Sequence, residues 1–302
     1  MFYIQTSLII CDESAKPPQL RGGTVTILVY RDAGERVAMK IGFIGLGNMA
    51  TAIIGGLLEA GIASPADIVG SAKTEQTRAR MEERFSIDAS LSNAEVAQAA
   101  DVVVLAVKPV FLPQVIEEIT DAVDGDKLVV SIAAGLTCER IQDLFGHPVR
   151  LVRCMPNTPA LVGAGCTAVC AADTATDEDE ALCLKLMGSF GRAIAIPERL
   201  MDAAGAVGGS SPAFAFMFIE ALADGAVAAG MPRAQAYEFA AQSLMGSAKL
   251  ALESSKHPGE LKDMVCSPGG TTIEGVRVLE EAGFRAAAMD AIQACVQKSK
   301  AL

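Results

Sequence analysis

A glycine turn that joins a short apolar strand to an apolar helix constrains the fold of this chain more than any other feature. Residues 39–50 read Met-Lys-Ile-Gly-Phe-Ile-Gly-Leu-Gly-Asn-Met-Ala. Gly45 permits a tight turn, Gly47 lets the backbone approach phosphates, and the small Ala50 lets helix and strand pack closely. The N–H groups and the dipole at the helix start attract an anion. The pattern predicts a dinucleotide-binding turn with cofactor contacts from Gly45, Leu46, Gly47, Asn48, Met49 and Ala50.

The order of apolar segments predicts an α/β fold followed by an all-helical part. Two stretches, residues 101–107 and 128–132, are apolar except for Asp101 and Ser131, and such stretches are typical of strands buried in a parallel sheet. Strands alternate with helices as far as residue 196, which indicates an open, mostly parallel, Rossmann-like sheet. Beyond about residue 198 the periodicity is helical almost throughout.

These patterns divide the chain into three expected parts. Residues 1–38 are expected to be an N-terminal extension, poorly ordered. Residues 39–198 are expected to form an NAD(P)-binding Rossmann domain, and residues 199–302 a helical domain for dimerisation and substrate binding. Length supports this division, because about 150 residues per domain gives two domains for 302 residues.

Composition bounds the partners of the chain. Hydrophobic residues make up 51% of the sequence, and the mean hydropathy of +0.36 is high for a soluble protein. Such a surplus suggests that a second subunit covers part of the helical domain. The alternative is a self-sufficient helical bundle. The net charge of −11 argues against nucleic acid as a partner, because phosphates require a basic face.

Membrane and metal sites are not expected. The longest later apolar run, residues 211–231, is interrupted by Glu220 and Asp224, whereas a spanning helix needs about 18 or more apolar residues. The eight cysteines form no C-x-x-C pair and have no His at ligand spacing, which argues against zinc. Reduced thiols are typical of a cytoplasmic protein.

The second strand indicates which nicotinamide cofactor is bound. In dinucleotide folds an acid about 20 residues past the glycines contacts the adenosine ribose. Here the strand ends in Ser71, with Lys73, Thr74 and Arg78 just beyond. Hydroxyls and cations attract a 2′-phosphate that a carboxylate would repel, so NADPH is favoured, with NADH as the other candidate. The alternative is that Lys73 and Arg78 are solvated helix surface.

Two further strand ends carry small residues that leave room for a flat ring at the carboxyl edge of the sheet. Lys108 has the chemistry of a catalytic group, but the adjacent proline favours a backbone role. The residues at these turns are Ala106, Val107, Lys108, Pro109, Ala133 and Ala134.

A second glycine turn opens one of the last helices. Residues 267–272 read Ser-Pro-Gly-Gly-Thr-Thr. Consecutive glycines expose backbone N–H groups, and the helix behind them adds its dipole, so the turn could hold a carboxylate. The alternative is an ordinary capped turn.

Together these residues resemble the pyrroline-5-carboxylate reductase family over nearly the whole chain apart from residues 1–38. The stretches that carry the resemblance are Gly-Phe-Ile-Gly-Leu-Gly-Asn-Met-Ala (42–50), Ala-Val-Lys-Pro (106–109), Ser-Ile-Ala-Ala-Gly (131–135), Arg-Cys-Met-Pro-Asn-Thr-Pro (153–159), His-Pro-Gly-Glu-Leu-Lys-Asp (257–263) and Ser-Pro-Gly-Gly-Thr-Thr (267–272).

The resemblance implies an NAD(P)H-dependent reductase that converts 1-pyrroline-5-carboxylate to L-proline, the last step of proline biosynthesis. It implies that Ser71, Asn93 and the two turns at residues 106–109 and 133–135 line the cofactor. It also implies that Thr272 is the catalytic residue that hydrogen-bonds the ring nitrogen of the substrate. Homodimers and decamers are expected, with the substrate turn of one subunit over the cofactor of its partner. The substrate-binding residues implied are Val265, Ser267, Gly269, Gly270, Thr271 and Thr272.

The chain departs from the pattern of the family at one position. Ser211 stands where the family usually has Gly, which places the geometry of that helix entry in question.

A 3-hydroxyacid dehydrogenase or an imine reductase would share the glycine turn. A hydroxyacid dehydrogenase would need a catalytic Lys near the domain junction, where the chain offers only the more distant Lys249. A non-catalytic NADPH-binding regulator would have no need of the substrate turn. His147 and His257 both precede Pro and are expected to be structural or solvent-facing.

Overall fold

The computed structural model describes residues 28–30 and 36–301 of the chain. The strands in this part are β1 (Leu28–Tyr30), β2 (Arg36–Ala38), β3 (Ile41–Ile44), β4 (Ile68–Ser71), β5 (Asp88–Ser90), β6 (Val102–Leu105), β7 (Leu128–Ser131), β8 (Arg150–Met155), β9 (Gly165–Ala171) and β10 (Gly191–Ala195). The helices are α1 (Asn48–Glu59), α2 (Glu75–Phe85), α3 (Asn93–Ala99), α4 (Leu112–Ile119), α5 (Cys138–Phe145), α6 (Asp177–Gly188), α7 (Met201–Ala204), α8 (Ser211–Ala228), α9 (Arg233–Glu253), α10 (Pro258–Val265), α11 (Thr271–Glu281) and α12 (Phe284–Lys300).

Two short strands lie within the predicted N-terminal extension. β1 and β2 pair antiparallel, with Val29 opposite Val37. Residues 1–27 and 31–35 lie outside the described part of the chain. The prediction that the extension is poorly ordered falls mainly on those residues and stays a prediction.

The first part of the chain is built on an eight-stranded sheet in the order β10-β9-β8-β7-β6-β3-β4-β5. Neighbouring strands are parallel except for β8 and β9, which pair antiparallel. From β3 the chain moves outward to β4 and β5, then returns to the other side of β3 at β6. Because the order reverses there, the carboxyl ends of β3 and β6 border the crevice where α/β sheets bind ligands. The predicted Rossmann-like fold class is confirmed.

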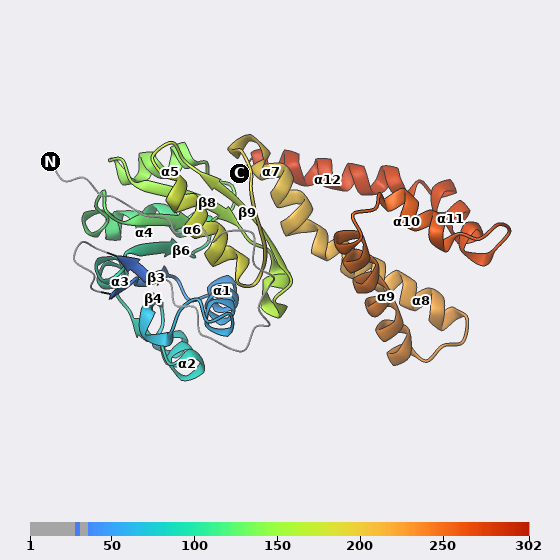
Figure 1. Cartoon of the computed structure of the whole chain (residues 1–302), viewed down its shortest axis with the longest axis horizontal. Coiled ribbons are helices and arrows are strands. Elements are labelled where there is room, and N and C mark those ends of the chain that lie inside the picture. The colour runs from blue at the N-terminus through green and yellow to red at the C-terminus, as the bar shows by residue number, and fades with distance from the viewer. Residues whose placement is uncertain (1–27, 31–35, 302) are drawn as a thin grey trace, which may run out of the picture.

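Helices cover both faces of this sheet (Figure 1). One buried cluster joins the sheet to α1, α2 and α6, and the other joins it to α3, α4 and α5. Side chains alternate between the two clusters along a strand: Ile41 and Phe43 of β3 belong to the first, and Ile44 to the second. Each face therefore has its own core, and the carboxyl edge between them carries the turns.

The helical part begins with one long helix. α7, a π-helical segment at Gly205–Ser210 and α8 run on without a break. In a regular helix the ring of Pro212 would clash with the carbonyl four residues earlier. The wider π turn provides room for it. Ser211 has a φ of −64°, so the geometry here does not require glycine.

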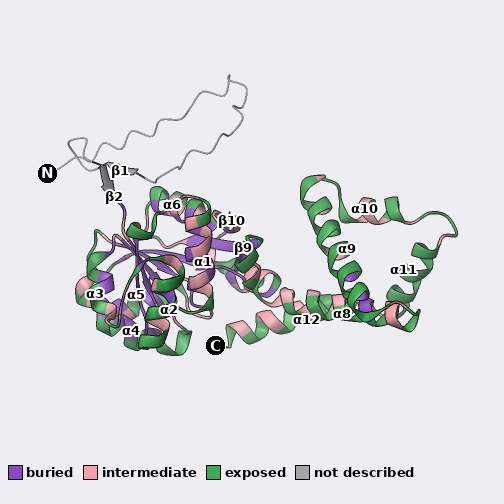
Figure 2. Cartoon of the chain, turned by 90° about the horizontal axis from the view of Figure 1, so that it is seen from below, coloured by how far each residue is buried: buried purple, intermediate pink, exposed green. Residues whose placement is uncertain are grey.

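Much of the helical part is exposed in the single chain (Figure 2). Phe216, Met217 and Phe239 are 64%, 67% and 67% exposed, and the buried cluster between α8 and α9 consists of Ala223, Ala236 and Ala240. By length and composition the helix Glu198–Ala228 could cross a membrane, and 11% of its apolar window is buried. A face this apolar needs a cover from outside the single chain.

Asp179, near the start of α6, is a carboxylate buried to 2% exposure. It accepts hydrogen bonds from Nε of Arg150 at 3.0 Å and from the N–H of Thr176 at 2.9 Å. Burial raises the pKa of this carboxyl, but the hydrogen bonds from Arg150 and Thr176 outweigh burial and lower the pKa below its ordinary 3.8. The side chain is therefore charged at neutral pH.

We expect Asp179→Asn to lower the free energy of unfolding by about 2 kcal/mol at neutral pH, because it removes a charge-assisted hydrogen-bond acceptor. Since the folded pKa is depressed, this contribution is complete above pH 3.8 and is lost as the pH falls through the folded value. Urea unfolding at successively lower pH measures it. Asp177→Asn, an exposed acid in the same turn, is the control. A wild-type advantage that does not shrink in acid would contradict the assignment.

Candidate active site

The first glycine turn lies at the carboxyl end of β3, beside the reversal in strand order. Gly45 has a φ of +97°, a conformation that favours glycine. A Cβ there would lie 2.8 Å from Cγ1 of Val107 and 2.9 Å from the Ala106 carbonyl oxygen. The Gly45 N–H donates to the Ser71 carbonyl at 3.1 Å, which fastens the turn to the end of β4. Leu46 is 2% exposed, so its side chain is not available to a ligand.

The start of α1 fits a dinucleotide pyrophosphate. Gly47 is exposed at the N-cap, and a Cβ built on it meets no atom of the described residues within 4 Å. In the described part of the chain no side chain caps the helix, and its first turn has no acid, so the N–H groups of Asn48 and Met49 lie at an uncompensated positive end. Ala50 is fully buried, as close packing of helix on strand requires. Gly47 places no side chain on this approach.

Ser71 and Asn93 are joined to each other below the turn. The Ser71 hydroxyl donates to Oδ1 of Asn93 at 2.6 Å, and Nδ2 of Asn93 donates to Oε2 of Glu118 at 2.6 Å. The N–H of Gly45 lies 3.3 Å from the same hydroxyl. Ser71 is 1% exposed, so its hydroxyl is not open to a ligand. It acts on the predicted cofactor site by holding Gly45. Glu118, which the sequence analysis did not single out, anchors the network from α4.

Of the two cations predicted near the ribose, one is available. Lys73 is exposed directly beyond β4, and its Nζ lies 5.4 Å from the ring centroid of Phe111. Arg78 instead donates to Glu75 and Glu82, so its charge is balanced within α2. Phe111, which is 45% exposed, was missed in the sequence. Its signal would have been an aromatic side chain two residues past Pro109 in a turn.

The other predicted cofactor residues lie at the same edge of the sheet. The turn after β6 is held by the Ala106 N–H, which donates to the Ile44 carbonyl at 2.9 Å. The turn after β7 lies next to it, because β6 and β7 are parallel neighbours. Exposure increases along the first turn and stays low on the second: Ala106 and Val107 are half-buried, Lys108 and Pro109 are exposed, Ala133 is buried and Ala134 is half-buried.

The second glycine turn, residues 267–272, opens α11. Gly269 has a φ of +67°, and the Gly270 N–H donates to the Ser267 carbonyl at 3.0 Å. No side chain of the residues that the structure describes caps the helix, and Thr271 and Thr272 are exposed in its first turn. Backbone N–H groups and two hydroxyls are thus presented together, as an anion site requires. Val265, the last residue of α10, is 65% exposed.

Within one chain the two glycine turns do not face each other. Figure 1 places α10 and α11 toward the far end of the helical arm, and β3 and α1 in the sheet domain at the other side. Figure 2, turned by 90°, shows the same separation. The predicted cofactor and substrate residues are therefore gathered into two separate groups on a single chain.

The Lys and His residues that an alternative function could use lie on the surface or make structural contacts. Lys249 is 70% exposed and lies 3.9 Å from Glu253, on α9. Nδ1 of His257 accepts the Gly259 N–H at 3.1 Å and so caps α10. Within residues 28–30 and 36–301, no three His, Cys, Asp or Glu side chains form a group that could hold a metal ion.

Comparisons with known proteins decide the family. Residues 198–302 match the family described as "Pyrroline-5-carboxylate reductase dimerisation". A pyrroline-5-carboxylate reductase from Escherichia coli (strain K12) is 53% identical over 263 residues, which cover 87% of this chain and 98% of that protein. The chain belongs to the pyrroline-5-carboxylate reductase family. It is therefore an NAD(P)H-dependent oxidoreductase, which confirms the enzyme class that the sequence predicted.

Solved structures of reductases agree with this family. One from Coxiella burnetii has a TM-score of 0.82 at 35% identity, covering 87% of this chain and 97% of that one. A pyrroline carboxylate reductase from Plasmodium falciparum "with NADP bound" has a TM-score of 0.79 at 32% identity, with the same coverage. Residues 40–135 match the family described as "NADP oxidoreductase coenzyme F420-dependent". The reductase thus binds a nicotinamide cofactor and a small-molecule substrate, and it is a homo-oligomer through its dimerisation domain.

Proposed function

We propose that this reductase converts 1-pyrroline-5-carboxylate to L-proline with hydride from NADPH, as the last step of proline biosynthesis. The observation that carries the proposal is the pair of open anion-binding turns. One, at residues 45–50, lies at the sheet edge where dinucleotides bind. The other, at residues 267–272, presents amides and hydroxyls suited to a small carboxylate.

NADPH, when bound, supplies the hydride. The N–H groups at the start of α1 would hold its pyrophosphate, and Lys73 its 2′-phosphate. The amides of residues 269–271 would hold the substrate carboxylate, while the Thr272 hydroxyl hydrogen-bonds the ring nitrogen. A protonated imine is already an electrophile, so the main task of the protein is to keep the donor and acceptor carbons in near-attack geometry.

We further propose that the active site forms between two subunits in a cytoplasmic homodimer that assembles into decamers. Two observations support a site shared between two subunits: the two turns lie apart on one chain, and large apolar side chains of the helical part are exposed. A partner subunit that covers the apolar face of α8 would bring its turn over the cofactor. Light scattering in dilute detergent-free buffer measures the assembly; a monomeric enzyme with full activity would contradict the arrangement.

The activity is tested by oxidation of NADPH with 1-pyrroline-5-carboxylate, beside a panel of 3-hydroxyacids assayed in the reverse direction with NADP. We expect rapid turnover with the pyrroline only. Turnover of a 3-hydroxyacid would favour the dehydrogenase alternative, and NADPH binding without turnover of any substrate would favour the regulator.

Cofactor preference is tested by charge reversal at Lys73. We expect Lys73→Glu to lower the ratio of kcat/KM for NADPH to that for NADH by about tenfold, because it places a carboxylate where the 2′-phosphate would lie. Arg80→Glu makes the same reversal on an exposed residue of α2 and should leave the ratio unchanged. Equal ratios in the two variants would remove Lys73 from the cofactor site.

A further inference from the structure

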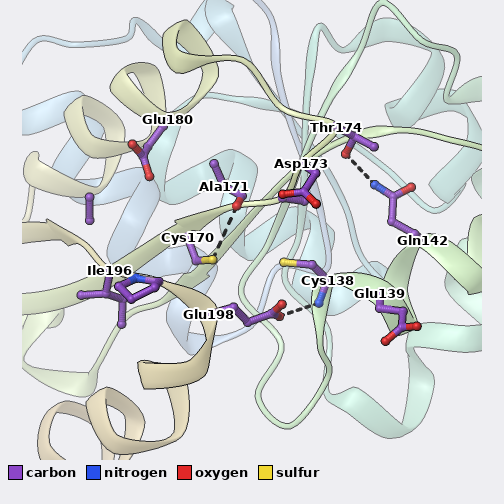
Figure 3. Close-up of a pocket in the computed structure, with 13 residues that line it drawn as sticks. Cys138, Glu139, Gln142, Cys170, Ala171, Asp173, Thr174, Glu180, Ile196 and Glu198 are labelled. Atoms are coloured by element: carbon purple, nitrogen blue, oxygen red, sulfur yellow. Dashed lines mark hydrogen bonds between the residues drawn. The ribbon is translucent and has the colours of Figure 1, made fainter.

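Glu198 lies where the chain leaves the sheet and enters the helical part, in a 3-10 turn at Glu198–Leu200. One of its oxygens, Oε1, accepts the N–H of Cys138 at 2.6 Å and Nη1 of Arg153 at 3.1 Å. Figure 3 shows the carboxylate of Glu198 directed at the start of α5, with the Cys138 and Cys170 thiols above it. A single carboxylate oxygen therefore connects three separate segments.

Both donors lie on elements that flank the turn at residues 133–135, where the nicotinamide is expected. Cys138 is the first residue of α5, and this helix follows within three residues of the turn formed by Ala133, Ala134 and Gly135. Arg153 lies on β8 opposite Ser131, which is the last residue of β7 and precedes the same turn by two residues. Glu198 thus holds this turn from its downstream helix and from the neighbouring strand.

Arg153 depends on Glu198 to balance its buried charge. The Arg153 side chain is 7% exposed, and its Nε has no hydrogen-bond partner within residues 28–30 and 36–301. Among the described residues, Glu198 is its one ion-pair partner. Burial raises the pKa of Glu198, but the hydrogen bonds from Cys138 and Arg153 outweigh burial and lower the pKa. The carboxylate is therefore charged at neutral pH and balances an otherwise unpaired buried cation.

We propose that Glu198 is a positioning residue for hydride transfer. It holds the turn at residues 133–135 in a fixed position relative to the start of the helical domain. The proposal rests on the proposed function, because that function places the nicotinamide over this turn. Loss of Glu198 frees the turn, and a displacement of about 1 Å at a reacting centre can cost on the order of 100-fold in rate. The glycine turn after β3 is fastened separately through Ser71 and would be unaffected.

The test compares Glu198→Ala and Glu198→Gln with the wild-type enzyme. We expect Glu198→Ala to lower kcat by at least about tenfold while the Kd for NADPH changes by less than about threefold, since the phosphates supply most of the affinity. At saturation, the fluorescence of the bound nicotinamide should move toward that of free NADPH. 2′-Phospho-ADP, which lacks the nicotinamide, should bind equally to both proteins. Glu198→Gln, whose amide oxygen can still accept the Cys138 N–H, should recover part of both signals.

Glu139→Ala is the matched control, because Glu139 lines the same hollow as Glu198 (Figure 3) but is exposed on α5. Unchanged kcat and unchanged nicotinamide fluorescence in Glu198→Ala would overturn the proposal. A parallel loss of 2′-phospho-ADP binding would also overturn it, by showing general damage to the fold. If Glu198→Ala does not fold, the same measurements of kcat, nicotinamide fluorescence and binding of the two ligands on Glu198→Gln decide the proposal. Wild-type enzyme without turnover would overturn the proposed function, while the fluorescence comparison would still test Glu198.

Discussion

Gly47→Ala is expected to raise the Kd for NADPH by at least about 100-fold while the chain stays folded. The added methyl would occupy the space through which the pyrophosphate reaches the N–H groups of α1. Loss of two hydrogen bonds to a charged group, each worth about 1.5–3 kcal/mol, corresponds to a change of this size. Gly47 has a φ of −81° and its Cβ would meet nothing within 4 Å, so the cost in stability should stay below about 1 kcal/mol. Fluorescence titration with NADPH and thermal unfolding measure the two effects.

Two other glycines in the same region separate binding from folding. Gly45→Ala should lower stability as well as binding, because of its φ of +97° and the contact with Val107 at 2.8 Å. Gly55→Ala lies in the middle of α1, where its Cβ would make an ordinary contact of 3.7 Å with Phe85. It should bind NADPH normally and gain up to about 1 kcal/mol in stability. If Gly47→Ala and Gly55→Ala bound NADPH equally well, the pyrophosphate would not lie at this turn.

Thr272→Val is expected to lower kcat/KM for 1-pyrroline-5-carboxylate by about 10- to 100-fold. The change keeps the shape of the side chain but removes the hydroxyl that we place on the ring nitrogen, and a hydrogen bond to a charged group is worth about 1.5–3 kcal/mol. The residue is exposed in the first turn of α11, so the stability of the single chain should change little. Steady-state kinetics and NADPH titration measure the result.

Thr272→Ser keeps a hydroxyl at the same position and should recover most of the activity lost in Thr272→Val. Binding of NADPH should be the same in both variants, because the residue is proposed to contact the substrate. Equal kcat/KM for the Val, Ser and wild-type enzymes would remove Thr272 from the mechanism.

Local features of the fold could be predicted from the sequence because they depend on neighbouring residues. The strand, turn and helix at residues 41–59 follow from apolar periodicity and from the glycines at 45 and 47, and the structure confirms the turn. The antiparallel pairing of β9 and the π-helical segment at Gly205–Ser210 were not predicted. Both depend on how distant segments pack, and neither leaves a periodic signal.

Contacts between distant residues account for most of what the sequence did not reveal about the site. Ser71 was predicted at the cofactor, but the sequence could not show that its hydroxyl is bonded to Asn93. Arg78 has the right charge for a phosphate, yet Glu75 and Glu82 neutralise it one turn away on either side. Glu198 carries no motif of its own, and its role depends on contacts 45 and 60 residues away in the chain.

The central claim is that a nicotinamide bound by one subunit faces the substrate turn of another, and mixing two impaired variants tests it most directly. Gly47→Ala and Thr272→Val are unfolded together at equal concentration and refolded, beside each variant refolded alone. In a two-fold dimer, half of the dimers are then mixed, and one of the two sites in each mixed dimer combines an intact glycine turn with an intact substrate turn. The account predicts recovery of about one quarter of the wild-type activity. No activity above that of the separate variants, in a mixture shown to contain mixed dimers, would contradict it.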